Sequence, residues 1–306
     1  MYRKIILSIS VVIVLSSIGF SEGGKTGWWI LRRPQSTKPK PLTAVAGIRG
    51  DLSGVLYNSS VLSTIEQREV FLMTELGLAN DSFGGILYGQ PLRIGNIISG
   101  GFSVGFIYYD AGKEKLYYVE NNQEREQEVP LQRDVLVLAS YGQRVTGSIF
   151  AGATVKYANS SIVQAVSASA YAADLGMIYL PPVERLVVSL GLQNLGLTTK
   201  FVDKAEKMPT SLWCGVSYLK GITGSSYLCV GLELPYIIGE GKVMPSVGIE
   251  YSIGQFAVNL GYRFGAQDPL FHAGVGFSTA RFDFGYAFLP ARYLSHTHRL
   301  SVGFRF

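Results

Sequence analysis

Histidine, serine and charged side chains are the residues of this chain that could carry out chemistry. His296 and His298 lie two positions apart, so one face of a strand could present two metal ligands. No third ligand has a matching position, and we expect no metal site. The nucleophile elbow of hydrolases, a Gly-x-Ser-x-Gly turn between a strand and a helix, is not found, and no serine is spaced to suit a histidine and an acid. We therefore expect neither an enzyme nor a cofactor.

Other charged residues fall on the polar side of segments in which apolar and polar-or-glycine residues alternate. Such alternation predicts strands with two unlike faces. A dry soluble core would hold these charges only at high cost, whereas a membrane barrel can pair them across its lumen while its apolar face meets lipid. They would then tie the wall to whatever fills the lumen, or steer a substrate. The candidate lumen charges are Glu233, Glu250, Arg263, Arg281, Asp283, Arg299 and Arg305.

The alternation defines fourteen segments between Glu69 and Phe306. Short connections near 144–145, 182–183, 221–223, 254 and 280 interleave with longer ones at 110–131, 159–169, 195–208 and 291–295. An even number of strands, with short turns at one end and long loops at the other, is typical of outer-membrane barrels. The sequence predicts an all-β fold, a transmembrane antiparallel β-barrel of about 14 strands over 69–306, expected to be monomeric. The segments fall near 69–77, 83–91, 97–109, 132–143, 146–158, 170–181, 184–194, 209–220, 224–236, 242–252, 254–264, 270–279, 280–290 and 296–306.

Composition excludes several other classes of protein. Hydrophobic residues make up 47% of the chain, yet beyond residue 20 no apolar run approaches the roughly 18 to 20 residues that a membrane-spanning helix needs. The net charge of +5 comes from the first 41 residues, which leaves residues 42–306 near neutrality, at about −1. We therefore expect no basic face for nucleic acid.

The first 41 residues predict export. Arg3 and Lys4 precede an apolar stretch over 5–18, and small residues stand at 19 and 21, which together predict a secretory signal peptide over 1–21. Residues 22–41 mix Gly, Pro, Lys and Arg without periodicity and predict a flexible basic linker in the periplasm. The expected location is an outer membrane of the Gram-negative type, in contact with its lipid.

The two cysteines provide a check on the predicted faces. Cys214 is in phase with the apolar Leu212, hence outward, and Cys229 is in phase with Glu233, hence inward. Neighbouring strands would hold the two thiols on opposite faces, a geometry that excludes a disulfide. We predict two free thiols.

Three stretches of the chain resemble the PorV/PorQ family of outer-membrane proteins. Residues 46–62, AGIRGDLSGVLYNSSVL, resemble its N-terminal segment, in which Gly-Asp-x-Ser leads into Tyr-Asn-Pro-Ala. Residues 174–218 contain DLG, LGLQNLG and MPTSL, which resemble its central block, and residues 283–301 resemble its closing hairpin. The resemblance spans 44–306 in order. The family is similar to FadL-type transporters of hydrophobic compounds, which implies a fourteen-stranded barrel plugged by an N-terminal hatch, here residues 42–68.

The resemblance also implies site residues in the hatch. Asp51, Ser53, Tyr57 and Asn58 match its motif and would hold the hatch or contact a ligand. The family's Asn-Pro-Ala is replaced by Asn-Ser-Ser at 58–60, and the loss of the proline removes a fixed φ. This departure puts a role of the turn as a rigid plug in doubt.

FadL-type barrels release ligand sideways through a kink in the third strand. The corresponding segment here contains Gly100 and Gly101, and adjacent glycines are where a bulge or kink costs least. The pair is therefore a candidate lateral gate, or it is incidental in a chain with 36 glycines.

Two functions remain open on the sequence. The first is passive binding and uptake of hydrophobic small molecules through a plugged lumen with lateral exit. The alternative is a non-transporting component of a type IX-like secretion system that docks exported proteins, as the PorV branch of the family implies. The charged segment 110–131 would be a solvated external loop in the first case and a docking surface in the second.

Overall fold

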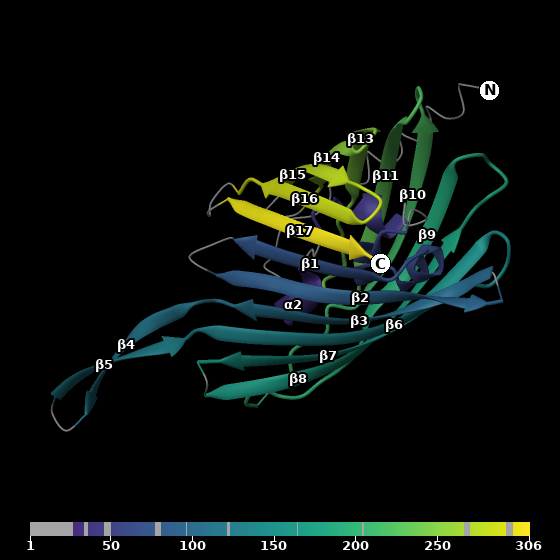
Figure 1. The fold of residues 1–306 in the computed structure, drawn as a ribbon. Coiled ribbons are helices and arrows are strands. Elements are labelled where there is room, and N and C mark those ends of the chain that lie inside the picture. Colours follow the sequence, from purple (N-terminus) through teal and green to yellow (C-terminus); the bar gives the residue numbers. More distant parts are fainter. Residues whose placement is uncertain are drawn as a thin grey trace.

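The protein is a closed antiparallel β-barrel with a polypeptide plug inside it (Figure 1). The computed structural model describes residues 27–33, 36–45, 50–76, 81–95, 97–120, 123–163, 165–203, 205–265, 270–291 and 296–306. The predicted signal peptide lies outside these residues. Among the described residues, no helix is both long and apolar enough to cross a membrane.

Fourteen strands of the described chain form the barrel wall, and each corresponds to one of the predicted segments. The predicted fold class is therefore confirmed. The strands are β1 (Glu69–Leu76), β2 (Ser82–Ile94), β3 (Ile97–Asp110), β6 (Gln132–Arg144), β7 (Ile149–Ile162), β8 (Val166–Tyr179), β9 (Leu186–Thr198), β10 (Ser211–Gly221), β11 (Ser226–Ile237), β13 (Ser246–Ile253), β14 (Phe256–Arg263), β15 (Phe271–Ser278), β16 (Phe282–Leu289) and β17 (Thr297–Arg305).

Each wall strand pairs with its neighbours in sequence, and β17 pairs with β1 to close the ring. Closure leaves no unpaired edge in the wall, which satisfies the backbone hydrogen bonds of every strand. Three further strands lie outside the ring: the short β12 (Lys242–Val243) pairs with β11, and β4 (Lys113–Glu120) and β5 (Gln123–Pro130) pair only with each other.

The two ends of the barrel differ in their connections. At the short-turn end, tight turns join β2 to β3, β6 to β7, β8 to β9, β10 to β11, β13 to β14 and β15 to β16. Gly224 and Gly254 adopt positive φ in two of these turns, a conformation that suits glycine. At the long-loop end, β4 and β5 form a hairpin that projects well beyond the wall (Figure 1). The described part of the charged segment 110–131 is therefore a two-stranded hairpin rather than an open loop.

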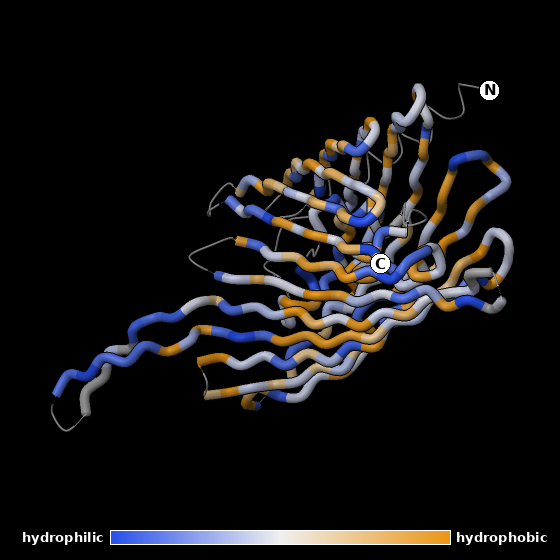
Figure 2. The backbone as a smooth tube through the Cα atoms, viewed as in Figure 1, coloured by the Kyte–Doolittle hydropathy of each residue, from blue (hydrophilic) through white to orange (hydrophobic). Residues whose placement is uncertain are grey.

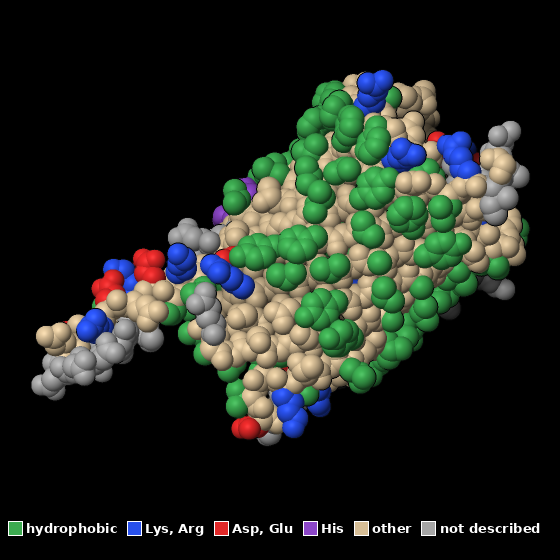
Figure 3. All heavy atoms as spheres, turned by 60° about the horizontal axis from the view of Figure 1, so that its bottom comes forward, with side chains coloured by type: hydrophobic (Ala, Val, Ile, Leu, Met, Phe, Trp, Pro, Cys, Tyr) green, Lys and Arg blue, Asp and Glu red, His purple; other side chains and the backbone are tan. Residues whose placement is uncertain are grey.

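The outer surface of the wall is apolar. Leu72, Val104, Val155 and Phe284 are exposed there and come from different strands, and Figure 3 shows green hydrophobic side chains across the visible face of the barrel. Hydrophobic and hydrophilic residues alternate along each strand (Figure 2), because neighbouring side chains of a strand point to opposite faces. The predicted outward apolar face is confirmed.

The lumen contains the plug, defined as the described residues between 27 and 65. Its segments are α2 (Trp29–Arg32), η2 (Pro41–Val45), η4 (Leu52–Leu56) and η5 (Ser59–Thr64). Apolar plug residues and inward apolar residues of the wall form one core, which excludes water from this part of the lumen. The core members include Leu52, Val61, Leu62 and Ile65 from the plug and Phe83, Leu87, Ile107, Leu136 and Ile178 from the wall.

The flexible linker predicted over 22–41 differs from the structure wherever that range is described. Ile30 and Leu31 lie in the core, and the ring of Trp28 is 5.8 Å from that of Phe201. Arg33 and Ser36 are buried as well. This segment crosses the lumen and contacts the wall on several sides, so its sequence lacks the period of a strand or an amphipathic helix.

Candidate functional site: the plugged lumen

A row of glycines on the inner wall receives the plug backbone. Gly101, Gly142, Gly152, Gly176 and Gly191 lie directly opposite one another, in register, on β3, β6, β7, β8 and β9. A Cβ atom at Gly101 would lie 2.5 Å from the carbonyl oxygen of Leu62, and one at Gly152 would lie 2.5 Å from Ser59 C and Ser60 N. Gly142 also faces Ser59, and Gly176 faces the side chain of Asn58, so side chains at these four positions would displace the plug. Gly191 faces the ring of Trp213 on β10 instead.

A second row lies across the lumen. Gly231, Gly248 and Gly261 are also in register, on β11, β13 and β14. They face Pro39, Pro41 and Leu42, whose nearest atoms lie 2.6 to 2.8 Å from the Cβ positions. Because both glycine rows lack side chains, the lumen between them is wide enough to hold the plug.

The candidate lateral gate lies beside an irregularity in the strand pairing, and it stays a prediction. Gly100 lies opposite Leu92 of β2 and Gln143 of β6, and Gly101 lies opposite Pro91 and Gly142. Both glycines are paired on both sides, but Gly100 is the last residue of β3 that pairs with β6. The register of the β2–β3 pairing shifts directly beside Gly100, because Ser99 has no partner on β2. Gly101 is also part of the glycine row.

The four hatch residues predicted from the motif fold and fasten the plug. Asp51 caps η4, accepting hydrogen bonds from Ser53 N at 3.0 Å and Ser53 Oγ at 2.6 Å. Asn58 caps η5 and accepts from Ser60 N at 3.2 Å and Ser60 Oγ at 2.6 Å. The Asn-Ser-Ser sequence therefore still forms a capped helical turn without proline.

Tyr57 joins the plug to itself and to the wall. Its hydroxyl accepts a hydrogen bond from Ser36 N at 3.1 Å, and its carbonyl accepts one from Gln193 Nε2 at 3.0 Å. Its ring packs against Trp213. Tyr57 therefore links the two halves of the plug to β9 and β10.

One carboxylate joins the plug to the seam of the barrel. Glu75 of β1 accepts hydrogen bonds from Arg33 Nε at 3.0 Å and from Arg299 Nε at 2.7 Å. Arg299 also donates to the carbonyl oxygen of Ser36 at 2.6 Å. All three charged side chains are at most 8% exposed, so their attraction is weakly screened by water.

Two lysines of the plug bind carboxylates on β11, on β13 and within the plug. Lys40 Nζ lies 2.6 Å from Glu233, and Lys38 Nζ lies 3.1 Å from Asp51 and 3.9 Å from Glu250. Burial alone would lower the pKa of Lys38, but the carboxylates of Asp51 and Glu250 raise it above its ordinary value of 10.5. Lys38 is therefore charged at neutral pH.

A buried network on β7, β8 and β9 was missed by the sequence reasoning. Lys156 Nζ lies 2.5 Å from Asp174 and 3.1 Å from Asn194 Oδ1. Asn194 N donates to Asp174 at 2.7 Å, and Asn194 Nδ2 donates to the plug carbonyl of Leu31 at 3.3 Å. Asp174 and Asn194 both fall in stretches that carry the family resemblance, which was the available signal.

The predicted lumen charges do not share one environment, and Arg263 lines a small pocket between the plug and β13 to β16. Glu233, Glu250 and Arg299 are buried in contact with the plug. Arg281 is exposed in the turn between β15 and β16, so its placement in the lumen was wrong. The predicted segment included Arg281, but the turn between β15 and β16 extends through this residue and β16 begins only at Phe282.

Arg305 and Asp283 form a separate cluster near the short-turn end. Arg305 binds Asp283 and lies 3.4 Å from Glu69. Since these residues lie at the start of β16 and β1 and at the end of β17, they brace the end of the wall and do not hold the plug.

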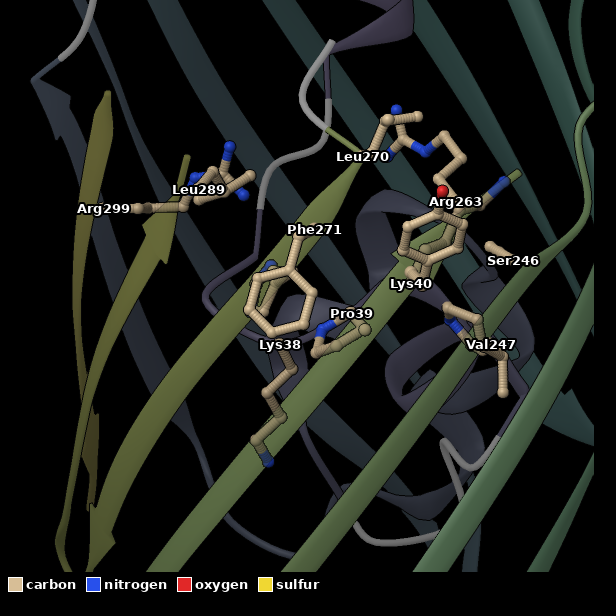
Figure 4. A pocket seen from close by; sticks show the side chains of 14 residues that line it. Lys38, Pro39, Lys40, Ser246, Val247, Arg263, Leu270, Phe271, Leu289 and Arg299 are labelled. Carbon is tan, nitrogen blue, oxygen red and sulfur yellow. The ribbon is translucent and has the colours of Figure 1, made fainter. Parts of the chain in front are cut away.

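A small basic pocket remains between the plug and β13 to β16. It is lined by Lys38, Lys40, Arg263, Arg299 and His272 together with apolar side chains such as Phe271 and Leu289, and no carboxylate lines it (Figure 4). His272 Nε2 lies 3.0 Å from the carbonyl oxygen of Thr37. The pocket has a volume of about 40 Å³, which holds water rather than a drug-sized ligand of about 300–1,000 Å³.

The residues first considered for chemistry do not form a reactive site among the described residues. Residues 101–105 do have the spacing Gly-x-Ser-x-Gly, but they lie within β3 rather than at a turn before a helix, and Ser103 is buried. His298 Nδ1 lies 2.8 Å from the hydroxyl of Tyr286 on the outer face. Cys214 is exposed, Cys229 is buried, and both are free, as predicted.

Comparison with solved structures identifies proteins that share the fold of this chain. No family model matches the chain, and no curated protein matches its sequence. The Pseudomonas putida toluene transporter TodX superposes with a TM-score of 0.56 at 13% identity, over 88% of this chain and 98% of that one. The Ralstonia pickettii toluene transporter TbuX gives 0.56 at 12%, over 83% and 93%, and a Pseudomonas aeruginosa FadL homologue gives 0.56 at 9%, over 93% and 100%. The chain thus has the fold of these FadL-like transporter barrels.

Proposed function

We propose that this chain is an outer-membrane barrel that takes up hydrophobic small molecules and that its plug closes the lumen until a substrate binds. The observation that carries the proposal is the buried plug, seated on two rows of glycines and fastened by ion pairs to the wall. The apolar outer face supports insertion in a bilayer. The fold shared with toluene transporters and a FadL homologue supports the class of substrate.

The pocket lining narrows the proposed substrate. Four cationic side chains and several apolar ones meet there without a carboxylate among the lining residues. Lys38, Lys40 and Arg299 already bind Asp51, Glu233 and Glu75 outside the lining. We therefore propose a compound with an apolar body and one acidic group that meets Arg263. The pocket is too small for a whole molecule of this kind, so uptake requires residues 38–41 to move away from β13 and β14.

Transport by cells tests the proposal directly. Cells that express the protein and cells with an empty vector are supplied with radiolabelled toluene, octanol or octanoate, and the initial rate of accumulation is measured. We expect expression to raise the rate for at least one of the three, and octanoate to exceed octanol. Equal rates with and without the protein for all three compounds would contradict the proposal.

A locked plug supplies the matched control. Replacing Thr37 and Ser301 by cysteine places two thiols at a plug-wall contact, where Thr37 Oγ1 lies 2.9 Å from Ser301 Oγ. In a Cys214→Ser and Cys229→Ser background, oxidation should stop the added uptake and reduction should restore it. Uptake that is unaffected by the cross-link would show that the plug need not move.

A further inference from the structure

Exposed cations lie along most of the short-turn end of the barrel, on the arc that runs from β16 through β1 to β10. They come from the ends of different wall strands or from the turns between them, so they are spread along this arc rather than gathered in one patch. They are Arg68 before β1, Arg93 on β2, Arg144 on β6, Arg185 before β9, Lys220 on β10 and Arg281 before β16, and we call them the basic rim.

Carboxylates do not neutralise most of the rim. Glu184 binds Arg185 at 3.1 Å. Arg93 donates to the backbone oxygen of Glu66 at 3.1 Å, and Arg144 donates to that of Gly147 at 3.1 Å. Within the described part of the chain, no ion pair is formed by Arg68, Lys220 or Arg281. These three guanidinium or ammonium groups are free to meet an external anion.

The opposite end of the barrel has a different arrangement. At the long-loop end, Lys115 binds Glu126 at 2.5 Å, Arg133 binds Asp110 at 2.9 Å and Arg32 binds Glu240 at 2.7 Å. These three cations are paired with acids of the same chain, and Lys200 and Lys207 share their loop with Asp203 and Glu206. The excess of positive charge is therefore a property of the short-turn end.

Outward aromatic residues fix the level of the rim relative to the apolar surface. The rings of Phe282 and Phe304 lie 5.0 Å apart, and those of Phe304 and Phe306 lie 5.6 Å apart, all at the short-turn end. Arg281 directly precedes Phe282, and Lys220 shares the outward face of β10 with Tyr218. Aromatic residues mark the membrane interface of such barrels, so the rim lies where the apolar band meets water.

We propose that the basic rim binds the phosphate groups of anionic phospholipids in the leaflet at the short-turn end. A leaflet surrounds the barrel on all sides, which matches cations distributed along most of the circumference, whereas an acidic protein would contact one patch. Cations beside an anionic bilayer surface attract it. The inference rests on the proposed insertion of the barrel in a membrane, and it assigns a lipid preference that uptake does not require.

Native mass spectrometry of the full chain tests the lipid preference. The wild type and an Arg68→Gln, Lys220→Gln, Arg281→Gln variant are reconstituted in vesicles of phosphatidylethanolamine and phosphatidylglycerol, extracted, and compared by the lipid that each retains. We expect the wild type to retain phosphatidylglycerol preferentially, and the variant to lose that preference by about tenfold or more. A Lys113→Gln, Lys115→Gln variant of the β4–β5 hairpin should behave like the wild type.

Three outcomes would overturn the proposal. Equal retention of the two lipids by the wild type is one, and an unchanged preference in the rim variant is another. The third concerns binding of polyglutamate in detergent. If the wild type binds polyglutamate and prefers neither lipid, and the rim variant no longer binds polyglutamate, the partner is an acidic protein. Insertion in neutral phosphatidylcholine vesicles, followed by heat-modifiable gel mobility, is measured for every variant. Failure at that step would contradict the membrane barrel itself and is distinct from failure of the lipid preference.

Discussion

Glu75 and Arg299 lie directly opposite each other on the first and last strands of the barrel, and their ion pair spans the seam where the ring closes. The same carboxylate binds Arg33 of the plug. Closure of the wall and attachment of the plug therefore depend on one buried side chain. Two arginines on one glutamate leave a positive charge, and Asp81, 3.3 Å from Arg33, balances it.

Replacing Glu75 by glutamine should destabilise the folded barrel. The change leaves Arg33 and Arg299 buried without the carboxylate between them, and removal of one partner from a buried ion pair costs about 3–5 kcal/mol. We expect the temperature at which the barrel loses its folded mobility on a gel to fall. Glu128→Gln, on the exposed hairpin, is the matched control, and an equal effect of the two changes would refute a role for the seam.

Replacing Gly152 by valine should dislodge the plug without opening the wall. The new Cβ would lie 2.5 Å from Ser59 C and Ser60 N, and overpacking of this kind costs about 1–3 kcal/mol. We expect a higher ion conductance in planar bilayers, with an unchanged heat transition of the barrel. Gly147→Val is the control, because a Cβ at Gly147 meets no atom within 4 Å. Equal conductance of the two variants would count against the glycine row as the seat of the plug.

The Lys38–Asp51 ion pair predicts a pH dependence of the plug. Burial would raise the pKa of Asp51, but Lys38 and Ser53 outweigh it and hold that pKa below its ordinary 3.8. A lowered pKa of an acid stabilises the fold above 3.8, and the contribution is lost as pH falls through the lowered value. The raised pKa of Lys38 stabilises the fold fully at every pH below 10.5. This contribution is lost only as the pH rises above 10.5 toward the raised value.

Asp51→Asn separates this ion pair from other acid effects. At neutral pH the variant should lose its plug, monitored by bilayer conductance, more readily than the wild type. Below the lowered pKa of Asp51 the two proteins should converge, because protonation removes the same charge from the wild type. A difference that persists unchanged in acid would refute the ionic basis of the contact.

Thiol labelling should report the two faces of one hairpin. Cys214 is exposed on the outer face and Cys229 is buried inside. In membranes, a lipid-soluble maleimide should modify Cys214 and leave Cys229 intact, while a charged methanethiosulfonate should modify neither. Cys214→Ser identifies the labelled site by mass spectrometry. Modification of Cys214 by the charged reagent would place that face in water.

Period-two alternation made the wall predictable, because a strand with one face in lipid and one in the lumen must alternate along its whole length. All fourteen segments matched strands of the structure. The same pattern located Glu233, Glu250 and Arg299 on the inner face. It failed at Arg281, since alternation says where a face is but not where a strand stops.

The plug was less predictable. Motif resemblance located Asp51, Tyr57 and Asn58, whose roles as caps and contacts depend on local sequence. Nothing local indicated that Ile30 and Arg33 would be buried, because their surroundings come from wall strands distant in the sequence. Glu75, for example, lies 42 residues from Arg33. The register of Gly101, Gly142 and Gly152 likewise depends on three strands together.

The sequence by itself determined the class of fold, the number of strands, the apolar outer face and the separation of the two thiols, because each follows from periodicity along one chain segment. Only the tertiary structure decided that Arg33, Lys38 and Lys40 lie in the lumen, that Gly101 contacts the plug backbone, and that Glu75 joins plug and seam. These features arise where several strands contact the plug. Strand register and closure of the ring place residues in contact that are far apart in the sequence.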